Sequence, residues 1–228
     1  MYAVGHGRTA PGQRIDSVFH RTPRRRRSPP ALSRDRIVTA TITLLDREGS
    51  SALTMRRVAA ELGVHATSLY WYVERREDLV DLAVDEVLAG AAAAPPATDL
   101  PWDTAVRETA RRFYAALTEH TWAAEFAGSR PLVGPNAVAL SRRIIEALGE
   151  LGGGEERRAV AIRAISNQIL GAATSAVAMR VAKEGRADEH GGALATAVSE
   201  ADTLAVEHTF FDQALDLVLL GIRTSEEA

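Results

Sequence analysis

The stretch that decides the fold is TMRRVAAELGVHATSLYWYV, residues 54–73. Its first half has apolar residues at helical spacing on one face, namely Met55, Val58, Ala59 and Leu62. After them, Gly63 permits the left-handed backbone of a tight corner, and Val64 fills the angle between two helices. This pattern predicts a helix-turn-helix, a motif whose second helix enters the major groove of DNA.

The second helix of this motif is predicted to present polar and aromatic side chains to a nucleic acid. Its outward residues are Ala66, Thr67, Ser68, Tyr70, Trp71 and Tyr72. Hydroxyl and indole groups donate hydrogen bonds to phosphates, and short side chains at a helix start reach base edges. For Trp71 the alternative is a core position, whereas Leu69 and Val73 are expected in the core.

The composition favours helices packed on helices. Of the 228 residues, 46% are hydrophobic but only 5% are aromatic, and Ala and Leu dominate the apolar set. The chain contains no Cys, which excludes disulfide bonds and thiolate metal sites. We therefore expect an all-α protein, with a core that suits one large domain or two smaller ones.

Charge is unevenly distributed along the chain. Residues 1–80 contain 14 Lys and Arg against 8 Asp and Glu, whereas residues 81–228 contain 13 against 22. A basic front indicates that only this part meets a polyanion, although a charged tail beside an ordinary acidic domain would give the same balance. The sequence has no apolar run of about 20 residues and no apolar segment after the N-terminal arginines, so we expect a cytoplasmic protein.

Composition shifts divide the chain into three parts. Residues 1–31, rich in Gly, Pro, Arg and Thr, are predicted to be a disordered basic extension. Residues 32–79 are predicted to form the helix-turn-helix domain, and residues 80–228 a larger helical domain. The run Arg24–Arg27 could reach along phosphates or into a minor groove, but a solvated tail is the favoured interpretation.

Three motifs lie at fixed spacing around the decisive stretch. A first helix capped by Ser33 ends at Gly49, residues 53–64 read LTMRRVAAELGV, and residues 68–73 read SLYWYV before Arg76. This arrangement, over about residues 33–88, resembles the TetR family of bacterial transcriptional regulators. A weaker match lies in the rest of the chain and resembles the regulatory domain of the tetracycline repressor subgroup, through Trp102, Phe113 and Gly128-Ser129-Arg130-Pro131.

The resemblance implies an all-helical homodimer with a three-helix DNA-binding head and a larger body for effector binding and dimerisation. Its dimer interface would use two helices per subunit, at about residues 155–183 and 208–222. The small residues 171–176 would permit close helix approach, although these faces could instead complete a monomer core.

The family pattern also assigns roles at the DNA site. Arg56 would contact a base or a phosphate, Thr54 would cap its helix and offer a backbone N–H to a phosphate, and Arg76 would neutralise a phosphate. Ala66 stands where the tetracycline repressor has Gln, so the operator is expected to differ from the tetracycline operator.

The effector is expected between the middle helices, although core packing is the alternative for each lining residue. The candidates are Thr109, Phe113, Phe126, Ser129, Arg130, Pro131, Asn167 and Gln168. Phe126 stands where the tetracycline repressor has a metal-binding His, and a phenyl ring cannot bind Mg²⁺. We therefore expect no metal and no cofactor, and an apolar or aromatic small molecule rather than magnesium-tetracycline.

These features together predict a homodimeric repressor that binds a palindromic operator and is released by a small-molecule effector. The alternatives are an activator of the same family, or a helical small-molecule-binding protein without specific DNA binding. An enzyme is not expected, because the sequence has no G-x-S-x-G, no glycine-rich phosphate loop and no H-E-x-x-H.

Overall fold

The computed structural model describes residues 17–21, 32–94, 100–185 and 203–224, and every regular element in these ranges is a helix. The predicted all-α fold is therefore confirmed. Within the same ranges, no helix combines the length and the apolar character that crossing a bilayer requires.

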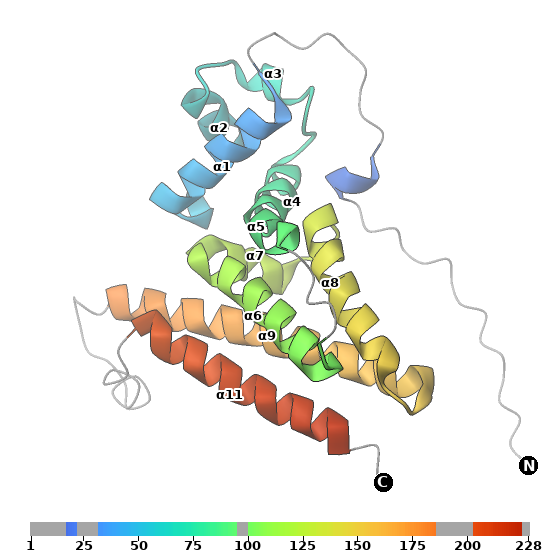
Figure 1. Ribbon diagram of the computed structural model, residues 1–228. Helices are drawn as coiled ribbons and strands as arrows, with labels where there is room; N and C mark the ends of the chain where they lie inside the picture. The colour runs from blue at the N-terminus through green and yellow to red at the C-terminus, as the bar shows by residue number, and fades with distance from the viewer. Residues whose placement is uncertain (1–16, 22–31, 95–99, 186–202, 225–228) are drawn as a thin grey trace, which may run out of the picture.

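Three helices at the top of Figure 1 form the N-terminal head: α1 (Arg34–Glu48), α2 (Met55–Glu61) and α3 (Ala66–Leu69). The predicted ends of α1 are confirmed, because the Ser33 hydroxyl accepts from the N–H of Arg36 at 3.2 Å and Gly49 has a φ of 77°. The Thr54 hydroxyl caps α2 by accepting from the N–H of Arg57. Packing stabilises these short helices through a shared core of Ile37, Leu44, Leu45, Val58, Leu69 and Val73.

The corner between α2 and α3 follows the prediction. Gly63 has a φ of 65°, and the N–H of Val64 donates to the carbonyl of Ala59 at 3.0 Å. Ala59 is buried, which lets α2 and α3 approach closely. The helix-turn-helix motif is therefore present, with an α3 one turn long that continues into a turn at residues 70–72.

The body begins with α4 (Arg76–Val87) and α5 (Ala89–Ala93) and continues with α6 (Trp102–Glu119), α7 (Thr121–Ser129) and α8 (Pro135–Ala147). Two long helices, α9 (Gly154–Gly185) and α11 (Thr203–Thr224), lie side by side at the base of Figure 1 and contact each other. An ion pair of 2.8 Å between Arg107 and Asp216 joins α6 to α11.

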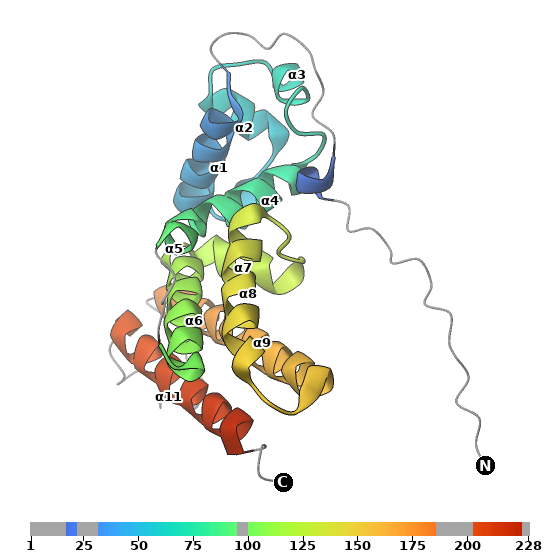
Figure 2. The ribbon, with the colours of Figure 1, turned by 45° about the vertical axis from the view of Figure 1, so that its right-hand side comes forward.

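Helix α4 connects the head to the body (Figure 2). It contacts α1 on one side and α7 and α8 on the other. The Asp78 carboxylate stabilises the N-terminus of α4, because it accepts hydrogen bonds from the backbone N–H groups of Glu74 at 2.7 Å and Arg75 at 3.2 Å. The domain boundary predicted between residues 79 and 80 therefore falls inside one continuous helix.

Part of the extension that we predicted to be disordered is ordered. Val18–His20 forms a 3₁₀ turn, η1, beside α4, with Ser17 and Val18 only 1% and 8% exposed. The prediction is therefore wrong for residues 17–21, because carboxylates of α4 provide partners that local composition does not reveal. The rest of the extension, including Arg24–Arg27, lies outside the described residues.

Candidate DNA interface and effector cavity

Helix α3 and the turn after it present an exposed surface on the head. Tyr70 is 46% exposed and Trp71 is 44% exposed, so Trp71 lies at the surface and not in the core. Thr67 is also exposed, whereas Ser68 and Ala66 are half-buried. Two large aromatic side chains that remain in solvent together indicate a binding surface.

The two arginines at the start of α2 differ in their surroundings. Arg57 forms an ion pair with Glu48 of α1. Arg56 is exposed and forms no ion pair with any residue that the structure describes. Its guanidinium is therefore available for a base or a phosphate, in the role that the family pattern assigns to it.

Two of the predicted DNA contacts have other partners in the structure. The Tyr72 hydroxyl donates to the carbonyl of Leu32, which fixes the entry to α1. The Arg76 guanidinium donates to the carbonyls of Leu53 at 2.9 Å and Ser50 at 3.0 Å, and lies over the Phe126 ring. In the structure, Tyr72 and Arg76 therefore make contacts that hold the head together and join it to α7, and their roles as phosphate contacts stay predictions.

A cavity of about 160 Å³ lies between α6, α8, α9 and the loop before α8. Its lining residues are Phe113, Arg130, Pro131, Leu132, Ser141, Ile144, Ile162, Ser166, Ile169 and Leu170. Of the predicted effector residues, Phe113, Arg130 and Pro131 line it. Most of the wall is apolar, and one guanidinium and two hydroxyl groups provide polar contacts.

The other predicted effector residues lie outside this cavity. Thr109 is buried and its hydroxyl donates to the carbonyl of Ala105 within α6. The Ser129 hydroxyl donates to the carbonyl of Phe126, whose ring lies under Arg76. These side chains complete the packing of the body and do not line the cavity.

Helical periodicity determines which residues of α9 line the cavity. Ile162, Ser166, Ile169 and Leu170 follow one another at intervals of four, three and one and share the cavity face. Asn167 and Gln168 were predicted from their polarity, but neither lines the cavity. Asn167 is exposed on the same stripe as Val160 and Gly171.

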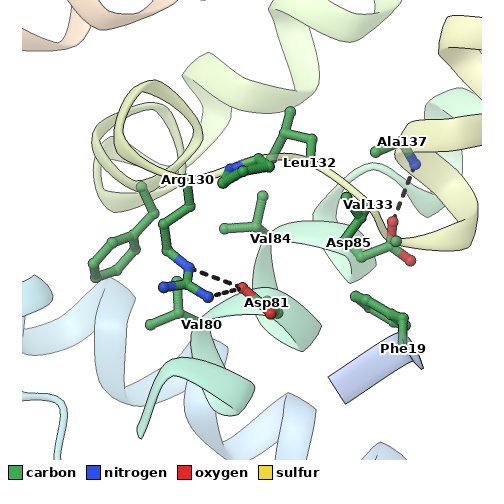
Figure 3. Close-up of a pocket in the computed structure, with 12 residues that line it drawn as sticks. Phe19, Val80, Asp81, Val84, Asp85, Arg130, Leu132, Val133 and Ala137 are labelled. Atoms are coloured by element: carbon green, nitrogen blue, oxygen red, sulfur yellow. Dashed lines mark hydrogen bonds and ion pairs between the residues drawn. The ribbon is translucent and has the colours of Figure 1, made fainter. Parts of the chain in front are cut away.

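Figure 3 shows a neighbouring crevice, in which further contacts link Arg130 and α8 to α4. Arg130 lines the cavity and also donates to the Asp81 carboxylate of α4, from Nε at 2.9 Å. The Asp85 carboxylate of α4 accepts from the N–H groups of Asn136 and Ala137, both at 3.0 Å, and thereby caps α8. Burial raises the pKa of Asp85 despite these hydrogen bonds.

The head and body also meet at the end of α1. The Asp46 carboxylate accepts a hydrogen bond of 2.7 Å from the indole N–H of Trp122, a buried residue of α7. His120 Nδ1 lies 2.7 Å from the same carboxylate. The role of Asp46 could not be predicted from the sequence, because nothing in the local pattern of α1 indicates a partner 76 residues away.

An apolar stripe on α11 remains uncovered in the single chain. Phe211, Leu215, Leu219 and Ile222 pack inward and form the buried face of this helix. A second stripe faces outward and consists of Phe210, Leu217 and Leu220, of which Leu217 is 71% exposed. A helix that is apolar on two faces needs a second partner to bury the outer one.

Comparison with known proteins supports the assignment of both domains. A model described as bacterial regulatory proteins of the tetR family matches residues 37–83, and a tetracyclin repressor-like C-terminal domain matches residues 94–225. An HTH-type transcriptional regulator of Saccharopolyspora erythraea is 38% identical over 166 residues, which are 73% of this chain and 68% of that protein. The HTH-type transcriptional repressor DrrR1 of Streptomyces coeruleorubidus is 35% identical over 146 residues, or 64% of this chain and 54% of that repressor.

A solved structure agrees over nearly the whole fold. The Streptomyces coelicolor protein ActR in complex with (S)-DNPA superposes with a TM-score of 0.68 and 27% identity, over 86% of this chain and 100% of that one. These relatives are regulators of transcription and not enzymes. From its two matched domains, its helix-turn-helix and its similarity to the Saccharopolyspora regulator, the chain belongs to the TetR family of bacterial transcriptional regulators.

Proposed function

We propose that the protein is a homodimeric repressor that binds a palindromic operator through α3 and leaves it when a small molecule occupies the cavity in the body. The observation that carries this proposal is the position of Arg130. Its side chain lines the cavity and pairs with Asp81 of α4, the helix that joins the body to the head. A molecule that contacts Arg130 therefore changes a contact of the helix on which the head is mounted.

The exposed stripes of α9 and α11 support a dimer. Leu217 and Leu220 on α11 and Val160 and Val181 on α9 are all more than half exposed in the single chain. Two copies that pack these faces together would form a four-helix interface and remove the apolar surface from water. Two heads in one dimer would bind two half-sites related by the same two-fold axis.

The cavity favours a largely apolar or aromatic effector with one acidic or carbonyl oxygen. Seven of its lining side chains are apolar, and the Arg130 guanidinium can donate to an oxygen acceptor. Magnesium-tetracycline is disfavoured, because Phe126 is not a metal ligand and its ring packs under Arg76. ActR, with a related fold, has been solved with the ligand (S)-DNPA, which is consistent with a cavity for an organic molecule in this family.

A gel shift with duplex DNA from the region flanking the gene tests the DNA half of the proposal. Arg56→Ala is expected to weaken specific binding by about 1–3 kcal/mol without unfolding the protein. Arg142→Ala, an equal change of charge at an exposed site on α8, is the matched control and is expected to bind like the wild type. A sequence-specific complex that survives Arg56→Ala unchanged would remove Arg56 from the interface.

Release by aromatic carboxylates and ketones, added to the preformed DNA complex, tests the effector half. Ile169→Trp fills the cavity and is expected to abolish release while leaving operator affinity intact. Val138→Trp, at an exposed position of α8, is the control for an added indole. Release that persists in Ile169→Trp would locate the effector elsewhere. A reporter gene fused to the regulated promoter distinguishes a repressor from an activator. Deletion of the gene for this protein raises reporter expression if the protein is a repressor and lowers it if the protein is an activator.

A further inference from the structure

We propose that residues 17–21 act as a strap that fixes the angle between the DNA-binding head and the body, and thereby the spacing of the two heads in the dimer. This inference rests on the proposed function for its effect on DNA. The strap is defined by Ser17, η1 and Arg21, and it contacts α4, beside whose N-terminal end η1 lies in Figure 2.

Ion pairs and hydrogen bonds attach the strap to α4 at two points. The Arg21 guanidinium donates to both oxygens of the Asp78 carboxylate, at 2.7 and 2.8 Å, and Asp78 is only 1% exposed. Such a bidentate pair fixes orientation as well as position. One turn further along α4, the Ser17 hydroxyl donates to Asp81 at 2.6 Å. Although burial of the Asp78 carboxyl opposes its ionisation, the bond from Arg21 and the N–H of Glu74 hold its pKa below the ordinary value.

Between these two points, Phe19 bridges the head and the body. Its ring lines the crevice between α4 and the loop before α8, with Val84, Leu132 and Gly134 (Figure 3). The guanidinium carbon of Arg34, the first residue of α1, lies 6.0 Å from the centre of the same ring. One short segment therefore contacts α1 of the head, the connecting helix and the body.

The strap also meets the contact that links the cavity to the head. Asp81 accepts from Ser17 through Oδ2 and from Arg130 through Oδ1. Its two oxygens thus join the strap to the residue that an effector would contact. When the strap is bound to α4, it favours the arrangement in which Arg130 donates to Asp81. The strap therefore opposes rotation of the head relative to the body.

The distance between the two heads of the dimer provides the direct test. The chain has no Cys, so Thr39→Cys on the exposed face of α1 gives one spin label per head. We expect a narrow distance distribution in the full-length protein, and a broader one when Phe19→Ala or Arg21→Ala is added. Arg142→Ala is the charge-matched control and should leave the distribution narrow. A distribution that both strap variants leave unchanged would overturn the proposal, whether or not the protein binds DNA.

Operator spacing provides the functional readout. The affinity for the selected palindrome is compared with the affinity for the same palindrome carrying one extra base pair between its half-sites. The strap variants are expected to lose about fivefold or more of this discrimination and to bind an isolated half-site like the wild type. If both variants discriminate between the two operator spacings as well as the wild type does, the strap proposal is contradicted. Absence of any specific binding by the wild type instead contradicts the proposed function and leaves the distance measurement as the test of the strap.

Discussion

Replacement of Gly134 by Ala should destabilise the junction between α4 and α8. A Cβ atom at this position would lie 2.2 Å from both Cγ and Oδ1 of Asp85 and 2.6 Å from its Cβ, and all three separations are far below van der Waals contact. The Asp85 carboxylate cannot simply turn away, because it accepts from the N–H groups of Asn136 and Ala137. Either this cap of α8 is lost or α4 and α8 move apart.

The magnitude follows from these two routes. Overpacking costs about 1–3 kcal/mol, and loss of hydrogen bonds to a charged group costs about 1.5–3 kcal/mol. Because one route relieves the other, the two costs do not add, and we expect the free energy of unfolding to fall by about 1–3 kcal/mol. For a chain of this size, Tm should then fall by roughly 2–12 °C.

Calorimetry at a fixed protein concentration measures this effect. Gly90→Ala in α5 is the matched control, because its new Cβ meets no atom within 4 Å, and it should leave Tm unchanged or raise it slightly. Asp85→Gly removes both the carboxylate and the Cβ atom that the new methyl group would meet, so Gly134→Ala should cost much less in that background. The reasoning is refuted if Gly134→Ala behaves like Gly90→Ala, or if its cost is the same with and without Asp85.

Three further predictions concern the dimer, the joint between head and body, and the strap. Leu217→Asp should convert the dimer to a monomer in sedimentation or light scattering, because it places a charge in the outer stripe of α11. Trp122→Phe should lower the free energy of unfolding by about 1.5–3 kcal/mol in denaturant titrations, since it removes the donor to the Asp46 carboxylate. The Asp78 pKa is lowered in the fold, so its pairing with Arg21 stabilises above the unfolded pKa of about 3.9 and is lost as the pH falls. The Tm difference between wild type and Arg21→Ala should therefore be largest near pH 7 and narrow below pH 4.

The head could be predicted from the sequence because local rules determine it. The caps at Ser33 and Thr54, the left-handed Gly63 and the apolar spacing of α2 each depend on neighbours within a few residues. The all-α fold could be predicted as well, because an apolar set dominated by Ala and Leu with few aromatic residues favours helices. The exposure of Tyr70 agrees with a surface that was predicted from residue type and spacing.

The contacts between distant segments could not be predicted in this way. Arg76 has the charge and position of a phosphate contact, but the structure uses it for two carbonyls in the turn between α1 and α2. The cavity face of α9 follows from helical phase and not from polarity, so Ser166 lines the cavity and Asn167 does not. The ordered residues 17–21 have partners in α4, and no local pattern indicates them.

The most direct test of the central claim is selection of binding sites from a random duplex library by the purified dimer. The account predicts enrichment of one palindrome whose half-site centres lie about one helical turn, roughly 34–36 Å, apart. It also predicts that Arg56→Ala relaxes the preference at one position in each half-site. A folded, dimeric protein that enriches no sequence, or only an unpaired half-site, would contradict the claim that two heads with an exposed α3 surface bind duplex DNA together.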